Sequence, residues 1–189
     1  MATQLSAWLY RRSTGWVALA AIALFVLFLV LVLPSQAARA RQNTGVDESP
    51  DSSLMYSRDD LYRIAELYGA EGRAAYIRAR FTFDVIWPLV YTGFLSTALS
   101  WVYGRAFAPG SPWRYANLSP VLGALFDYGE NLATSLVMAR YPARTPVVDL
   151  LAPVLTLVKW LFVNGSFLLL AVGVLVALWR WLMRRPQRT

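Results

Sequence analysis

Residues 15–33 decide the class of fold, and they read GWVALAAIALFVLFLVLVL. No charged side chain interrupts them, and an uncharged apolar run of about 18 or more residues is long enough to cross a bilayer as a helix. Arg11 and Arg12 precede the run and Trp16 lies at its start, which is the flanking pattern of a helix anchored at a membrane surface. The stretch therefore predicts a first transmembrane span.

A second interpretation of this stretch stays open. Ser35-Gln36-Ala37 follows it and has the small-x-small pattern that a signal peptidase cleaves. The apolar run is longer than the core of roughly 7–15 residues found in signal peptides, so a retained anchor is favoured over a cleaved signal.

The composition also indicates a membrane protein, with 57% hydrophobic residues and a mean hydropathy of +0.43. The formal net charge is +7, but the basic residues gather at the ends of apolar runs, where lipid phosphates rather than nucleic acid are the natural partner. The sequence has no Cys and no His, which excludes disulfides, Cys/His zinc sites and His-ligated haem. We therefore expect no metal and no cofactor, and any proton chemistry must use carboxylates, tyrosines or Lys159.

Three more apolar runs follow, at about 81–103, 119–139 and 150–181. The second of these begins at Ser119-Pro120, which is a favourable helix start. The last is longer than a bilayer requires, so we expect it to tilt or to protrude. The sequence thus predicts an all-α membrane protein whose four transmembrane helices form a bundle, with residues 1–189 as a single membrane domain.

The segment 34–80 is expected to lie outside the membrane, as a linker followed by a short amphipathic helix. Residues 42–53 are polar and rich in turn-forming types, which is typical of a flexible linker. Ser57 and Asp60 then have the spacing of a capping box, and Gly69 marks a turn. Between them apolar residues recur at helical spacing: Leu61, Ile64, Ala65 and Tyr68. We expect this helix to lie on the membrane surface.

The charges outside the spans predict the orientation. The N-terminus, the loop 104–118 and the C-terminus together hold eight arginines and no acidic residue, whereas the other side holds nine arginines matched by eight acids. Because basic residues in short loops stay in the cytoplasm, we expect both termini on the cytoplasmic side.

Four charged residues remain inside the predicted spans: Asp84, Asp127, Glu130 and Lys159. A charge at the centre of a bilayer costs about 2.5–3.5 kcal/mol on insertion scales, so such residues mark candidate functional sites. Lys159 is also the only lysine among the 18 basic residues.

The spacing of these residues predicts that they meet. Asp127, Glu130 and Asn131 fall on one stripe of a helix, and Asp84 and Tyr91 form a stripe on the span before it. Pro88 on that span has no N–H, so the carbonyl of Asp84 loses its helical partner. The candidate ligand-binding residues are therefore Asp84, Tyr91, Asp127, Glu130, Asn131 and Lys159.

The cluster also has a purely structural interpretation. Polar side chains between transmembrane helices can simply hold the helices together, at about 0.6 kcal/mol each. Three carboxylates facing one ammonium favour a hydrated pocket over a closed ion pair, since a surplus of acid must be protonated, hydrated or bound to a cation.

Four motifs carry a resemblance to known proteins: Gly69-Ala70-Glu71-Gly72-Arg73 with Tyr76; Asp84, Pro88 and Tyr91; Phe126-Asp127-Tyr128-Gly129-Glu130-Asn131; and Lys159. Together they resemble a family of uncharacterised bacterial four-span membrane proteins, which implies a bacterial inner (plasma) membrane and no defined activity. The architecture is also similar to that of the EXPERA group, which includes emopamil-binding sterol isomerases and carries an acid shortly before a proline on the second span. Those isomerases also use His, so the likeness implies a lipid-facing pocket and not their chemistry.

We expect the bundle to bind a lipid or small amphiphile, with the bilayer itself as the surrounding partner. Two alternatives stay open: a membrane enzyme in which Asp127 or Glu130 acts as general acid or base on a lipid, and a structural or accessory subunit of a membrane complex or homo-oligomer. We expect the pocket between spans two, three and four, where Gly93 and Gly123 leave room. Asp84 should lie at its mouth and Glu130 at its floor, with the amphipathic helix above it as a lid.

Overall fold

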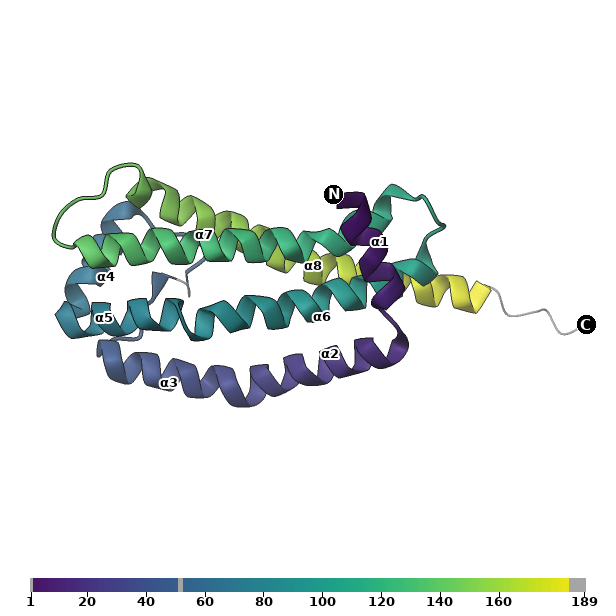
Figure 1. Ribbon diagram of the computed structural model, residues 1–189, viewed down its shortest axis with the longest axis horizontal. Coiled ribbons are helices and arrows are strands. Elements are labelled where there is room, and N and C mark those ends of the chain that lie inside the picture. Colours follow the sequence, from purple (N-terminus) through teal and green to yellow (C-terminus); the bar gives the residue numbers. More distant parts are fainter. Residues whose placement is uncertain (1, 51–52, 184–189) are drawn as a thin grey trace, which may run out of the picture.

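The computed structural model describes residues 2–50 and 53–183, and within them every regular element is a helix (Figure 1). Three stretches are long and apolar enough to cross a membrane, namely Gly15–Thr44, Gly69–Ala106 and Val148–Met183. The third predicted span is a helix, α7 (Ser119–Arg140), but it is not among these three. Its polar stripe lowers its mean hydropathy, so whether it crosses a membrane has to be argued from its packing.

The first long helix consists of α2 (Gly15–Leu27), a π-helical turn (Phe28–Val32) and α3 (Leu33–Thr44), which follow one another without a break. The prediction that residues 34–44 belong to an outer linker is therefore wrong. The sequence from Gln36 onward is rich in Ala, Arg and Gln, which are strong helix formers. The helix ends at Gly45, whose φ of 74° closes it in the left-handed conformation.

The chain continues with α4 (Arg58–Leu67) and α5 (Gly69–Arg80), and Gly69 makes the turn between them with a φ of 61°. The capping box at Ser57 and Asp60 is present as predicted. Residues 51–52 of the predicted linker lie outside the described residues.

The amphipathic helix α4 packs against the bundle. It contacts α7 and α8, and it buries Leu61, Tyr62, Ile64 and Ala65 there. These side chains meet Val137 and Met138 of α7, so the apolar face of α4 is covered by protein. The prediction that α4 rests with this face on a membrane surface is therefore wrong.

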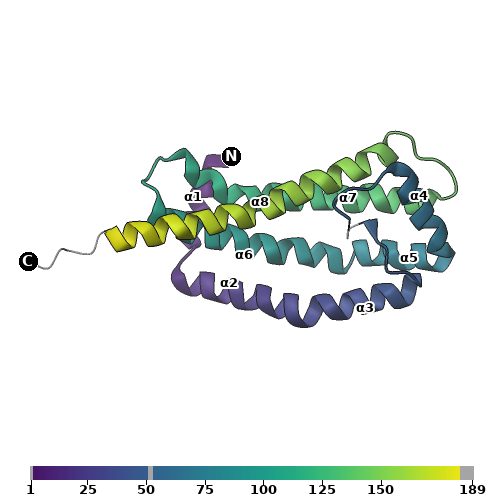
Figure 2. The ribbon, with the colours of Figure 1, turned by 180° about the vertical axis from the view of Figure 1, so that it is seen from behind.

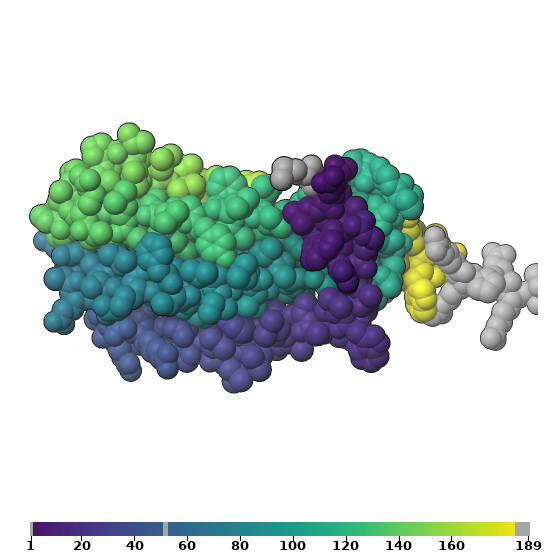
Figure 3. All heavy atoms as spheres, in the orientation of Figure 1, coloured from purple at the N-terminus to yellow at the C-terminus, as the bar shows by residue number. Residues whose placement is uncertain are grey.

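The bundle core is formed by α6 (Phe83–Ala106), α7 and α8 (Val148–Met183), with α2 and α3 packed along α6 and α5 (Figures 1 and 2). The space-filling view shows α2 and α3 as one layer along the edge of the molecule, below α5 and α6 (Figure 3). A Cβ atom added at Gly123 of α7 would lie 3.1 Å from the side chain of Val163, so this glycine allows α7 and α8 to pack closely. Its predicted role in opening a pocket is wrong.

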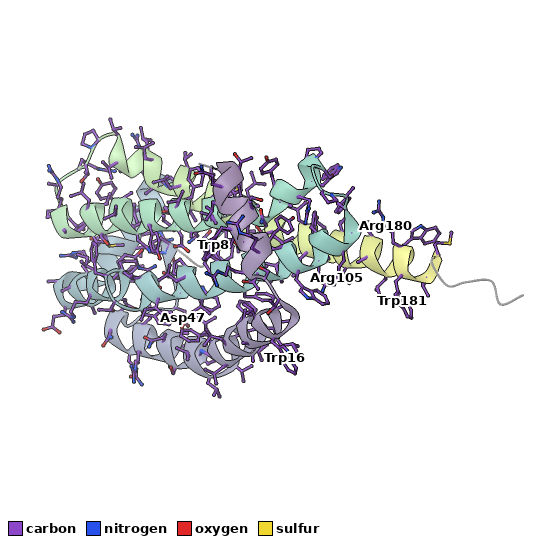
Figure 4. The ribbon with its side chains drawn as sticks, turned by 45° about the vertical axis from the view of Figure 1, so that its right-hand side comes forward. Trp8, Trp16, Asp47, Arg105, Arg180 and Trp181 are labelled. Carbon is purple, nitrogen blue, oxygen red and sulfur yellow. The ribbon has the colours of Figure 1, made fainter. Side chains whose placement is uncertain are left out.

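The end of the bundle far from α4 is closed by α1 (Ala2–Arg12) and a 3-10 helix (Pro112–Leu118) (Figure 1). Ser6 of α1 is buried and donates a hydrogen bond of 2.9 Å to Asn117, whose amide group in turn donates to Ser100 at 2.9 Å. The helix α8 extends beyond this end, and Arg180 and Trp181 lie on its protruding part (Figure 4). The last helix was expected to tilt or to protrude, and the end of α8 protrudes from the bundle (Figure 4).

Candidate ligand-binding cleft

The intramembrane charges predicted from the sequence converge between α6, α7 and α8. Glu130 is completely buried, and its carboxylate pairs with the ammonium group of Lys159, which is 5% exposed. Asp127 lies one turn earlier on α7, with an oxygen 3.8 Å from Lys159 Nζ. The two acids therefore hold the one lysine from neighbouring positions of a single helix face, as the spacing predicts.

Each acid has a second partner that fixes its geometry. The Thr156 hydroxyl donates to Glu130 Oε1 at 2.7 Å, while Lys159 occupies the other oxygen. The Tyr91 hydroxyl donates to Asp127 Oδ2 at 3.0 Å. Tyr56, from the segment before α4, lies 3.1 Å from the Thr156 hydroxyl and extends the chain of polar groups toward the outer end of the bundle.

The proline on α6 has the effect that the sequence predicts. Pro88 leaves the carbonyl of Asp84 without its helical N–H, and the side-chain amide of Asn131 donates to that oxygen at 3.4 Å. One residue further on, the Tyr128 hydroxyl donates to the carbonyl of Val85 at 2.9 Å. Two side chains of α7 thus satisfy the backbone that the proline disturbs, and they hold α6 against α7.

Asp84 lies apart from the lysine and is paired with a different cation. Arg80 Nη1 is 3.2 Å from Asp84 Oδ2, and the same nitrogen donates to Asn131 Oδ1 at 3.3 Å. The predicted balance of three carboxylates against one ammonium is therefore wrong, because Arg80 adds a second cation. The spacing of Arg80 and Asp84, four residues apart on a helical stretch, was the signal that could have revealed this pair.

A cleft of about 1130 Å³ opens beside this cluster. One wall comes from the first long helix, where Phe25, Leu29 and Leu33 form an apolar stretch and the α3 residues from Gln36 onward are largely polar or small. The other wall comes from α5, α6, α7 and α8, and carries most of the predicted residues: Asp84, Tyr91, Asp127 and Lys159. The cleft is larger than the roughly 300–1,000 Å³ of common ligand pockets.

The position of the cleft differs from the prediction. It lies between the first long helix and the rest of the bundle, not between spans two, three and four. Glu130 and Asn131 do not line it, because Glu130 is covered by Lys159 and Thr156 and Asn131 is turned to Asp84 and Arg80. Of the stretch expected to form a lid, Asp59 to Tyr68, only Tyr68 lines the cleft, where its hydroxyl donates to the Glu48 carbonyl of the turn after α3. The apolar face of α4 itself packs on α7 and α8, so α4 does not cover the mouth as a lid.

Two further residues of α8 face the cleft, and the first of them, Asn164, was not singled out from the sequence. Asn164 is exposed in the cleft and makes no hydrogen bond within the described part of the chain. Trp160 also lines the cleft, and its indole N–H is buried without an acceptor among the described residues. The signal in the sequence for Asn164 was a single side-chain amide within an otherwise apolar run.

The cleft therefore combines an apolar stretch on one wall, polar groups on the facing wall and the exposed Asn164 amide, which makes no hydrogen bond within the described residues. Among the described residues no cluster of His, Cys, Asp and Glu has a geometry suited to a metal ion. The chain matches no protein-family model, no curated protein and no solved structure. What the cleft does must be argued from its own chemistry.

Proposed function

We propose that this chain is a four-span integral membrane protein that binds a lipid or similar amphiphile in the cleft between its first long helix (α2–α3) and α8. The observation that carries the proposal is the two-sided lining of the cleft. The apolar stretch of Phe25, Leu29 and Leu33 suits hydrocarbon, while Asp127, Lys159 and Asn164 offer hydrogen bonds on the facing wall. A ligand with both characters matches this lining.

The fourth span in this proposal is α7. Its 22 residues give a length of about 33 Å at 1.5 Å per residue, which equals the thickness of a bilayer core. Its polar residues Asp127, Glu130 and Asn131 are buried in the protein, and Leu125, Leu132 and Leu136 form its exposed face. Polar groups turned inward and leucines turned outward are the pattern of a membrane helix inside a bundle.

The charges of the loops and ends support the orientation in the membrane. The N-terminus, the C-terminus and the loop after α6 are rich in arginine and free of acid, which supports their position on the cytoplasmic side. The helices α4 and α5 then lie on the opposite side of the membrane. A bacterial plasma membrane remains the expected setting, because the residue pattern resembles bacterial four-span proteins.

The structural interpretation of the cluster accounts for only part of it. Glu130 is enclosed and has protein partners on both oxygens, as expected of a group that holds helices together. Asp127, Lys159 and Tyr91 are held by protein on one side and border the cleft on the other. We therefore assign Glu130 to positioning Lys159, and assign the cleft-facing groups to the ligand.

Native mass spectrometry of the protein released from a mild detergent tests the proposal. Ala79 of α5 lines the cleft, so Ala79→Trp places an indole inside it and obstructs that part, while Ala74→Trp places the same bulk on α5 away from the cleft. We expect the native chain and Ala74→Trp to retain a bound amphiphile, and Ala79→Trp to lose it.

Two results would count against a binding cleft. One is a native chain that carries no adduct in mild detergent even when lipid is supplied. The other is equal retention by both tryptophan variants, which would place the amphiphile elsewhere on the membrane-facing surface.

A further inference from the structure

The charges that line the cleft are unequally compensated. Each acid there already faces a basic side chain, and the pairs are Asp47 with Arg41, Glu48 with Arg63, Asp84 with Arg80 and Asp127 with Lys159. Lys159 is shared between Asp127 and Glu130, so this buried cluster keeps one negative charge, whereas Asp47, Glu48 and Asp84 each face an arginine of their own.

Two arginines of the lining have no such partner. Arg39 of α3 and Arg78 of α5 both border the cleft, both are exposed, and neither forms an ion pair within the described residues. The helices that carry them pack against each other at the outer end of the bundle. This end of the cleft thus carries two positive charges that the described residues do not balance.

We propose that Arg39 and Arg78 form the headgroup site of the cleft and select an anionic phospholipid. This inference rests on the proposed function and names the class of ligand. A phosphate between two guanidinium groups receives charge-assisted hydrogen bonds from a planar donor array that matches its oxygens. Basic residues at a membrane surface attract anionic lipid by about 1 kcal/mol each, a factor of about five in binding.

The dimensions of the cleft agree with a lipid held in this way. Arg39 follows Phe25 along the same long helix by a rise of about 20 Å, which exceeds half of a bilayer core of about 30 Å. A headgroup at Arg39 and Arg78 would therefore let a chain run down the apolar stretch past Leu33 and Leu29 to the level of Phe25.

The deep end of the cleft suits an uncharged polar group. Lys159 offers a donor next to the Asp127 carboxylate, which accepts, and a single hydroxyl group can use both. Asn164 can either donate or accept there. The two arginines at the mouth of the cleft would thus recognise the charge of the headgroup. The paired Asp127 and Lys159 at its deep end would bind neutral polar atoms.

Spin-labelled lipids test the headgroup assignment. The probes are phosphatidylglycerol and phosphatidylcholine carrying the same label on the acyl chain, added to the full chain in lipid nanodiscs. The test variant is Arg39→Gln with Arg78→Gln. The control is Arg58→Gln with Arg140→Gln, which removes the same charge at exposed positions that do not line the cleft.

We expect the native chain and the control to hold phosphatidylglycerol at least about fivefold more strongly than phosphatidylcholine. The test variant should bind both probes alike, and the native preference should shrink at high salt because exposed charges are screened. Ala79→Trp serves as the blocked reference in every arm.

The outcomes separate this inference from the proposed function. Bound probe with no headgroup preference in the native chain, or a preference that survives in the test variant, overturns the assignment to Arg39 and Arg78 while the cleft still binds lipid. Equal binding by the native chain and Ala79→Trp overturns both.

Discussion

At the scale of single residues, Lys159 is the group on which the cluster depends. It is buried, it pairs with Glu130, and it lies 3.8 Å from Asp127. The loss of one partner from a buried ion pair leaves an uncompensated charge in a medium of low dielectric constant, and this costs far more than the net stabilisation by the intact pair.

Lys159→Met should therefore lower the free energy of unfolding by about 3–5 kcal/mol. Lys159→Met combined with Glu130→Gln should recover much of that loss, because the fully enclosed acid is then uncharged. Denaturation in a defined detergent, with all variants compared in a double-mutant cycle, gives the coupling. A double variant no more stable than Lys159→Met would show that the two groups do not interact.

The contact between Asn131 and the backbone of Asp84 leads to a second cycle. Asn131→Ala removes the donor to a carbonyl that Pro88 leaves without its helical bond, at an expected cost of about 1–3 kcal/mol. Pro88→Ala restores the backbone N–H, so in that background Asn131→Ala should cost less. The same unfolding measurement decides this, and an equal cost in both backgrounds would show that the carbonyl does not matter.

At the scale of elements, local sequence rules predicted the starts and turns of the helices well, but they predicted the packing partners of the helices poorly. The start of α4 at Ser57 and Asp60, the turn at Gly69 and the effect of Pro88 all depend on neighbours along the chain, and all are present. The burial of α4 depends on contacts with α7 and α8, which no local pattern specifies. The continuation of α3 to Thr44 does have a local signal, the Ala, Arg and Gln residues from Gln36 onward, which the prediction of a linker overlooked.

The N-terminus of α4 predicts a pH dependence. The backbone N–H and hydroxyl of Ser57 both donate to the Asp60 carboxylate, and they lower its pKa below the ordinary value. A carboxyl group whose pKa is lowered by folding stabilises the folded form above its unfolded pKa, and this contribution is lost as the pH falls through the folded pKa.

Ser57→Ala should therefore destabilise the first turn of α4 by about 1 kcal/mol at neutral pH, and by less in acid where Asp60 is protonated. Amide hydrogen exchange in α4 measures this directly. A cost that does not change between neutral and acidic solution would contradict the capping role of Asp60.

At the scale of the whole molecule, the candidate site could be predicted only in part. The convergence of Asp127, Glu130 and Lys159 was predicted from helical spacing and opposite charge, and it is present. The predictions for the partner of Asp84 and for the position of the cleft were wrong. Both depend on how the first long helix (α2–α3) and α5 pack beside α6. That arrangement is a tertiary contact and leaves no periodic signal.

The path of the chain through the membrane can be tested because the sequence has no cysteine. Single cysteines at Gln42, Ala108 and Ala143, all exposed, report the last turn of α3 and the segments after α6 and α7. An impermeant thiol reagent should label Gln42→Cys and Ala143→Cys from outside the cell and should reach Ala108→Cys only after lysis. Labelling of Ala108→Cys and Ala143→Cys from the same side would show that α7 does not cross.

A density map of the protein in a nanodisc of mixed anionic and zwitterionic lipid tests the central claim most directly. The account predicts elongated density between α2–α3 and α8, with one end at Arg39 and Arg78 and the rest descending along Leu29 toward Asp127 and Lys159. A cleft closed by direct contact of the first helix with α8, or one that contains only water, would contradict it.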